Sequence, residues 1–324
     1  MKIFVTGGTG FVGGYVLEAL QKAGHEVHAL VRPGSEHKLP PDFSGKIISG
    51  NVFDFSFPSE SDAVVHLIGI LRPNFYRGDT FEKIHFQATK IVVNKAADAG
   101  VKRFLLMSAN GVKPHGTAYQ RTKYMAEQYL RNSGLAWTIF RPSVLFGNPE
   151  YPRGDAGKPE FSSLLYRQMV KPPLPAPMFH SGMAIRQAGS FKLQPAYVGD
   201  LAKGVAAALT TDSSAGKIYH VGGSDELTWR EIIDTIATAC AAAPRAMICM
   251  ALFSSPLAIA SAIGFGAVTS GTAPVMAEAV RVESQQSTGF GDVVEKVSPA
   301  VVSVRVKAKM QPAAAGPDSF FGGQ

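Results

Sequence analysis

The chain is poor in several features that would identify a function at once. Only two of its 324 residues are cysteine, Cys240 and Cys249, so the sequence indicates neither a disulfide framework nor a zinc site, and we expect no metal. The net charge is +7, but no run of five or more Lys and Arg occurs, so we expect no nucleic-acid partner. The first residues, MKIFVTGG, read as a strand and not as a signal peptide. We therefore expect a cytoplasmic location, with a peripheral position at the inner membrane as the alternative.

The first 150 residues alternate short apolar runs with helix-like stretches. Apolar runs of this kind, separated by helices, are typical of parallel strands that are covered on both faces. The pattern predicts an α/β fold with a Rossmann-like, doubly wound parallel sheet. Gly24, Gly100 and Gly134 follow helical stretches and are expected to end them. Thr228 and Glu231 have the spacing of a capping box at the start of a later helix.

The composition changes twice along the chain. We expect residues 1–242 to form an NAD(P)-binding domain, with a small Pro- and Gly-rich insertion at 148–195 and residues 217–242 on the substrate side. Residues 243–279 contain a stretch without charge, 246–277, which fits a secretory signal or a membrane span, or alternatively a buried helical hairpin. Residues 280–324 are predicted to be a largely flexible C-terminal tail that does not read as part of the α/β fold.

A glycine-rich segment, VTGGTGFVGG, lies between the first predicted strand and the first predicted helix. Glycine there permits a tight turn and a close approach of the backbone to a pyrophosphate, which the helix N-terminus attracts. The alternative is a glycine-rich turn without a ligand. The residues predicted to contact the dinucleotide are Gly7, Thr9, Gly10, Phe11, Val12, Gly13, Arg32, Asn51, Val52, Leu67, Ile68, Gly69, Lys123, Pro142, Ser143 and Val144.

The end of the second predicted strand reads ALVRPGS and has no carboxylate before Glu36. Proteins that bind NAD place Asp or Glu at this point to accept from the ribose 2′-hydroxyl. The 2′-phosphate of NADP instead favours a cation such as Arg32. The sequence therefore predicts NADP(H) as the preferred cofactor, with NAD(H) as the alternative. Arg32 could also be an ordinary exposed residue at a strand end. Asn51 and Val52, at the next strand end, are suited to the adenine.

Five segments in a fixed order carry a resemblance: TGGTGFVG, VVHLIG, LLMSANG, AYQRTK and IFRPSVLFG. Over residues 1–242 the chain resembles the short-chain dehydrogenase/reductase superfamily, and more narrowly its atypical, extended members related to the NADPH-binding accessory subunit of respiratory complex I. The resemblance implies that Ser108, Tyr119 and Lys123 are catalytic. Tyr119 would exchange a proton, and Lys123, together with the positive nicotinamide ring, would lower the pKa of Tyr119. Lys123 would also bind the ribose, and Ser108 would hydrogen-bond the substrate.

Two departures from the family pattern affect this interpretation. His85 stands where extended members often have Asn, which leaves its role in a proton relay open. The loop between Ser108 and Tyr119 is short, so either the site is tighter or Ser108 is displaced from it.

Residues 245–324 resemble the N-terminus of a periplasmic HtrA/Deg-type serine protease. Such an enzyme needs His, Asp and Ser together, and all eight histidines precede residue 245. We expect no protease activity, and we suspect a fusion or truncation near residue 243.

Two functions follow from the sequence. The first is an NAD(P)-dependent oxidoreductase or epimerase-like enzyme acting on a small molecule, for which a sugar nucleotide, a quinone and an isoprenoid-like compound all remain open. The second is a non-catalytic NADPH-binding subunit or assembly factor of respiratory complex I, with that complex as its partner. Membrane association through residues 246–277 is compatible with both.

Overall fold

The computed structural model describes residues 1–148, 160–172, 176–181, 187–240, 247–252 and 305–308. Its centre is an eight-stranded sheet with the order β14-β11-β6-β5-β4-β1-β2-β3. The strands are β1 (Lys2–Thr6), β2 (Glu26–Val31), β3 (Lys46–Ser49), β4 (Ala63–His66), β5 (Arg103–Met107), β6 (Ala136–Pro142), β11 (Lys217–Gly222) and β14 (Arg305–Ala308). All neighbours pair in parallel except β14, which is antiparallel to β11. The predicted doubly wound α/β fold is confirmed.

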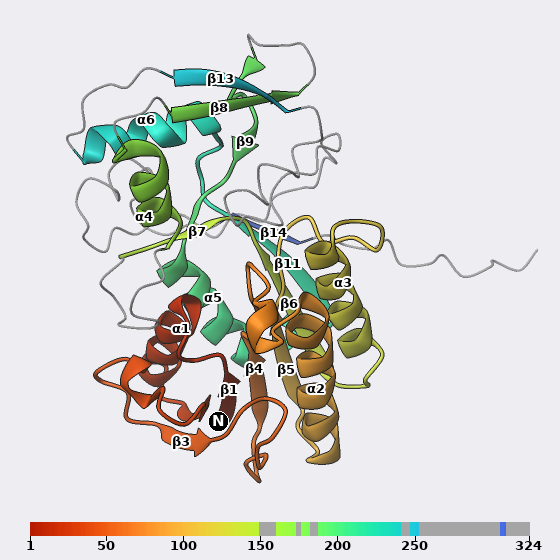
Figure 1. Cartoon of the computed structure of the whole chain (residues 1–324). Coiled ribbons are helices and arrows are strands. Elements are labelled where there is room, and N and C mark those ends of the chain that lie inside the picture. The colour runs from red at the N-terminus through yellow and green to blue at the C-terminus, as the bar shows by residue number, and fades with distance from the viewer. Residues whose placement is uncertain (149–159, 173–175, 182–186, 241–246, 253–304, 309–324) are drawn as a thin grey trace, which may run out of the picture.

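Helices cover both faces of this sheet, with α1 (Phe11–Lys22) and α5 (Val198–Thr210) on one face and α2 (Ala88–Asp98) and α3 (Ala118–Arg131) on the other (Figure 1). Side chains alternate between the two layers, as a strand requires. In β1, Ile3 and Val5 join the apolar cluster of α1 and α5, whereas Phe4 joins that of α2. The strands are therefore apolar at successive positions because both of their faces are buried.

The helix ends follow the turn chemistry of the sequence. Gly24, Gly100 and Gly134 have φ of +76°, +69° and +80°, the left-handed conformation that glycine adopts without strain after a helix. The predicted capping box of Thr228 and Glu231 opens α6 (Trp229–Ala239). Both predictions are confirmed.

A smaller apolar cluster lies beyond the end of the sheet, around α6, α4 (Phe161–Leu165) and the π-helical turn η4 (Tyr166–Val170) (Figure 1). Short strand pairs connect these elements: β7 (Leu145–Phe146) with β10 (Ala196–Tyr197), β9 (Lys192–Leu193) with β12 (Leu227–Thr228), and β8 (Ala176–Ser181) with β13 (Met247–Leu252). Short helical turns are η1 (Glu36–Lys38), η2 (Phe75–Arg77), the π-helix η3 (Glu82–Gln87) and η6 (Asp212–Ser214).

The sequence distinguishes two C-terminal segments, 243–279 and 280–324. Most of their residues lie outside the described part of the chain. Of segment 243–279, residues 247–252 form β13, and of segment 280–324, residues 305–308 form β14 at the edge of the main sheet. Among the helices that the structure describes, none combines the length and the apolar character that a membrane crossing requires.

Candidate functional site

The glycine-rich segment forms a tight loop between β1 and α1. Gly7 has a φ of +82°, and its carbonyl accepts the Gly10 N–H at 3.1 Å. A Cβ at Gly13 would lie 2.2 Å from the Gly7 oxygen and 2.7 Å from Gly8 Cα, so only glycine fits there. Gly10 is the N-cap of α1 and places no side chain over the helix end. The first turn of α1 therefore presents backbone N–H groups in a cradle suited to an anion.

The carboxyl ends of neighbouring strands surround this loop. A Cβ at Gly7 would lie 3.0 Å from the backbone of both Leu67 and Ile68, so the loop touches the end of β4. At the end of β6, the Ser143 N–H donates to Val221 at 2.7 Å, and Pro142 accepts from Asn110 at 2.9 Å. The structure thus brings these predicted residues to one edge of the sheet, where open α/β sheets bind ligands.

Arg32 lies one residue beyond β2 and is exposed. Within the part of the chain that the structure describes, its guanidinium makes no ion pair or hydrogen bond, so it is available to a ligand. Asn51 is also exposed, and its Oδ1 accepts the Phe53 N–H at 2.8 Å. Val52 is buried. The predicted adenine contacts of Asn51 and Val52 stay predictions.

Tyr119 and Lys123 lie one turn apart on the buried face of α3, and each is 6% exposed. The Lys123 ammonium donates to the Met107 carbonyl at 2.9 Å. A Cβ at Gly69 would lie 3.1 Å from Lys123 Nζ, so the ammonium lies beside the end of β4. Lys123 of the predicted catalytic pair therefore lies next to Gly69, a predicted cofactor residue.

Burial changes the pKa values of both Tyr119 and Lys123. Burial raises the pKa of Tyr119 to about 12, because the phenolate loses its hydration. Burial also lowers the pKa of Lys123 to about 8, although the Glu127 carboxylate opposes this change. In the protein alone desolvation dominates, and the Lys123 ammonium is bound to a backbone carbonyl. The expected lowering of the Tyr119 pKa by Lys123 together with the nicotinamide ring stays a prediction.

Ser108 is buried, and its hydroxyl donates to the carboxylate of Glu127. Arg141 holds the same carboxylate through its Nε at 2.9 Å and through Nη2. Tyr119 instead shares an apolar cluster with Ala109 and Val112. The substrate-binding role of Ser108 stays a prediction, and it would require the bond to Glu127 to break.

Glu127 and Arg141 were not among the residues predicted for the site. Glu127 is fully buried, and the Arg141 side chain is 17% exposed. A signal existed in the sequence, since Glu127 follows Lys123 by four residues and must share its face of the helix. The partnership with Arg141, on β6, was not visible in the sequence.

Two buried histidines lie beneath this site. Burial, with a contribution from the Lys123 charge, lowers the pKa of His66 to about 3 and that of His85 to about 2. Both rings are therefore neutral at physiological pH. The His85 ring stands edge-on to the Tyr119 ring, with 4.9 Å between the ring centroids.

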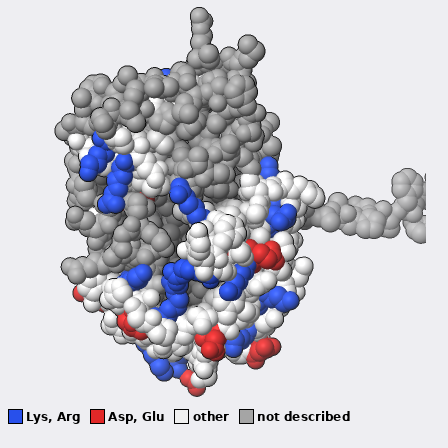
Figure 2. Space-filling model, in the orientation of Figure 1, with Lys and Arg blue, Asp and Glu red and all other residues white. Residues whose placement is uncertain are grey.

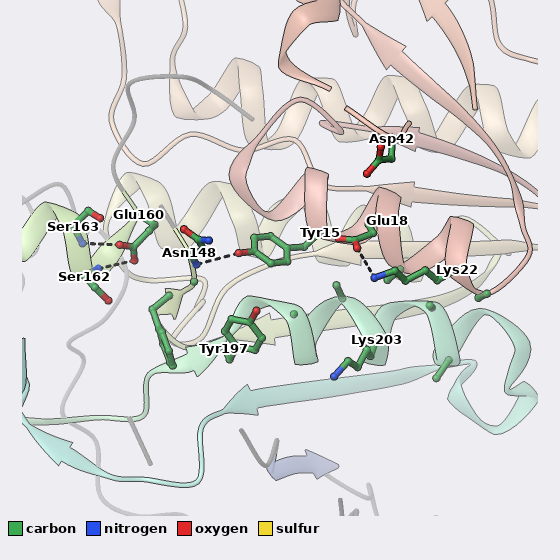
Figure 3. A pocket seen from close by; sticks show the side chains of 18 of the residues that line it. Tyr15, Glu18, Lys22, Asp42, Asn148, Glu160, Ser162, Ser163, Tyr197 and Lys203 are labelled. Atoms are coloured by element: carbon green, nitrogen blue, oxygen red, sulfur yellow. Dashed lines mark hydrogen bonds and ion pairs between the residues drawn. The ribbon is translucent and has the colours of Figure 1, made fainter. Parts of the chain in front are cut away.

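A cavity of about 1070 Å³ lies between α1, α5 and the α4 region (Figure 3). Tyr15 from α1 and Tyr197, just before α5, project toward it, and the Tyr15 hydroxyl accepts the Asn148 N–H at 3.1 Å. Alanines of both helices and charged side chains such as Glu18 and Lys203 also line it. None of the predicted catalytic or cofactor residues lines this cavity, so it is separate from the site at the strand ends.

Figure 2 shows Lys and Arg side chains over much of the described part of the face in view, whereas Asp and Glu side chains lie in its lower half.

Comparison with known proteins places these features in a family. A sequence model of the NAD dependent epimerase/dehydratase family matches residues 3–222. A mitochondrial NADH dehydrogenase [ubiquinone] 1 alpha subcomplex subunit 9 from Arabidopsis thaliana is 27% identical over 71% of this chain and 56% of its own length. The chloroplast stem-loop binding protein of 41 kDa b, also from Arabidopsis thaliana, is 25% identical over 75% of this chain and 63% of its own length. The chain thus spans less than two thirds of either relative.

Solved structures show the same fold. The UDP-glucuronic acid 4-epimerase of Bacillus cereus, in complex with NAD, superposes with a TM-score of 0.60 at 19% identity, covering 78% of this chain and 85% of the epimerase. At this identity the likeness concerns the fold alone.

Proposed function

Because its residues 3–222 match the family model, the chain belongs to the NAD dependent epimerase/dehydratase family, and we propose that it catalyses hydride transfer between a nicotinamide dinucleotide and a small substrate. One observation carries this proposal: Tyr119 and Lys123 are buried together on α3, with Lys123 Nζ beside Gly69 at the end of β4. The same edge of the sheet carries the glycine cradle. An acid–base pair next to a dinucleotide cradle is the arrangement that this chemistry needs.

The residues at this edge fit a dinucleotide. Gly7 and Gly13 allow the tight loop, since a Cβ at either would meet backbone within 3.0 Å, and the N-terminus of α1 that the loop leads into would hold the diphosphate. Lys123 would bind the hydroxyls of the nicotinamide ribose. Arg32 would hold a 2′-phosphate, and on this ground we propose NADP(H) as the preferred cofactor, with NAD(H) also accepted.

When bound, the dinucleotide supplies or accepts the hydride, and its oxidised ring adds a positive charge. Tyr119 would hold the proton that the substrate oxygen gains or loses. Bringing a pKa of about 12 to neutral pH corresponds to roughly 7 kcal/mol. One cation at ~4 Å supplies about 4 kcal/mol at an effective dielectric constant of ~20. Tyr119 would therefore need a second positive charge in addition to Lys123.

Native mass spectrometry of the full chain as isolated tests the cofactor proposal. We expect NADP(H) to co-purify or, failing that, to bind in calorimetry with a higher affinity than NAD(H). If neither dinucleotide binds at millimolar concentration, the proposed function fails. Reaction of the NADP+-loaded chain with UDP-glucose, whose sugar hydroxyl would give up the hydride, and of the NADPH-loaded chain with a short-chain ubiquinone, which would accept it, then tests the sugar-nucleotide and quinone proposals at the nicotinamide absorbance.

A second candidate function is a non-catalytic NADPH-binding subunit of a respiratory complex. Three features favour it: the Ser108 hydroxyl is held by Glu127, Ala109 and Val112 share an apolar cluster with Tyr119, and burial raises the pKa of Tyr119. The similarity to the alpha subcomplex subunit 9 agrees with it. In this case Tyr119→Phe would leave dinucleotide binding unchanged, no substrate would be turned over, and the chain would co-migrate with a respiratory complex on native gels.

A further inference from the structure

Alternating threonines and histidines form a buried network between the sheet, α2 and α3. Thr6 Oγ1 lies 2.7 Å from His66 Nδ1, and His66 Nε2 lies 3.1 Å from Thr89 Oγ1. His85 Nδ1 lies 3.1 Å from Thr122 Oγ1. All five residues are buried. The protons of such a network are fixed by counting donors, because each hydroxyl has only one proton to give.

The first half of the network defines the tautomer of His66. Thr89 donates its hydroxyl proton to the His85 carbonyl at 2.6 Å, so it can only accept from His66 Nε2. Nδ1 of His66 then has no proton and accepts from Thr6. Each hydrogen bond in this half therefore has a defined donor and acceptor, and the last acceptor is the His85 backbone carbonyl.

The second half defines the tautomer of His85. Thr122 donates to the Ala118 carbonyl at 2.8 Å, so it accepts from His85 Nδ1–H. Nε2 of His85 then accepts the Ile70 N–H at 3.1 Å. The other tautomer would donate from Nε2 to the Ile70 carbonyl at 3.0 Å, but it would forfeit the bond from the Ile70 N–H and take the Thr122 proton away from Ala118. The first arrangement makes more bonds.

The His85 ring is also fixed by packing. It lies in the π-helical turn η3, stacked on Phe81 with 5.2 Å between centroids and edge-on to Tyr119. A Cβ at Gly69 would lie 3.8 Å from His85 Nε2 and 3.1 Å from Lys123 Nζ. The His85 ring and the Lys123 ammonium therefore both lie close to Gly69.

We propose that His85 is a positioning residue that ties the Gly69–Ile70 segment to α3, and that it does not relay protons from Lys123. Both ring nitrogens are occupied by partners that fix Gly69–Ile70 and Thr122. The bond from Nδ1–H leads through Thr122 to the Ala118 carbonyl, and Nε2 accepts from the Ile70 amide; neither backbone group can pass a proton on. The dinucleotide-binding part of the test rests on the proposed function, whereas the part that reads the tautomers does not.

Nitrogen NMR of the full-length chain labelled with 15N-histidine reads the tautomers directly. We expect His85 to carry its proton on Nδ1 and His66 on Nε2, with neither signal changing between roughly pH 5 and pH 8. Exposed His37 provides the reference signal in the same spectra. A proton on Nε2 of His85, or a His85 signal that titrates in this range, would overturn the proposal.

Two variants of His85 distinguish a positioning role of this residue from a proton-relay role. His85→Gln can still offer an oxygen to the Ile70 N–H, whereas His85→Phe keeps only the packing. We expect His85→Phe to bind NADPH about tenfold more weakly and His85→Gln within about threefold of the native chain, with an unchanged pH profile of turnover. Equal losses in both variants would contradict the positioning role. If the native chain binds no dinucleotide, the proposed function fails and the NMR result alone decides this inference.

Discussion

Replacing Lys123 by methionine should stabilise the protein near neutral pH. Burial lowers the pKa of Lys123 from its ordinary 10.5 to about 8, a difference that corresponds to about 3 kcal/mol of cost for holding the charge in the folded state. Methionine has a similar length and carries no charge. It loses the bond to the Met107 carbonyl, worth about 1 kcal/mol. The net expectation is that Lys123→Met is more stable by about 2 kcal/mol at about pH 7.

The difference in unfolding free energy between Lys123→Met and the native chain should depend on pH. Below about pH 8 the folded and unfolded states both hold the Lys123 proton, and the folded state carries the full cost. From about pH 8 to 10.5 the unfolded chain binds more protons than the folded one, so the stability of the native chain rises with pH. The advantage of Lys123→Met should therefore shrink over that range and disappear above it.

Urea denaturation of the native chain and of Lys123→Met, at neutral and at alkaline pH, measures the difference. Lys22→Met is the matched control, because the Lys22 side chain is 73% exposed and its replacement should change the stability by less than about 0.5 kcal/mol. A Lys123→Met chain that is less stable than the native one at neutral pH, or a difference that does not vary with pH, would refute the reasoning.

Three further predictions concern the dinucleotide site. Tyr119→Phe should lower turnover at least about 100-fold while the Kd for NADPH stays within about threefold; unchanged turnover in a steady-state assay would remove Tyr119 from the mechanism. Arg32→Ala should weaken NADPH about tenfold and NADH about twofold in calorimetry, since a charge-assisted bond is lost at an exposed position; equal losses would show that Arg32 does not read the phosphate. Gly13→Ala should cost about 2 kcal/mol or more in urea denaturation, because its Cβ meets backbone at 2.2 Å. Gly10→Ala, with its nearest atom at 3.3 Å, is the control, and a similar cost there would contradict the steric argument.

The sequence by itself determined the order of strands and helices, the glycine loop and the helix ends. These features depend on residues close together in the chain: the spacing of apolar residues, the left-handed φ of Gly24, Gly100 and Gly134, and the capping box at Thr228. The positions of Tyr119 and Lys123 on one face of α3 follow in the same way from the helical repeat.

Only the tertiary structure decided what each polar side chain contacts. Ser108 is directed to Glu127 because β5, α3 and β6 meet there, and Arg141 completes that contact from β6. The direction of the pKa change of Tyr119 likewise depends on burial, to which the whole fold contributes. Local pattern fixes which way a side chain points within its own helix or strand, but its partners and its dielectric surroundings come from segments that only folding brings near.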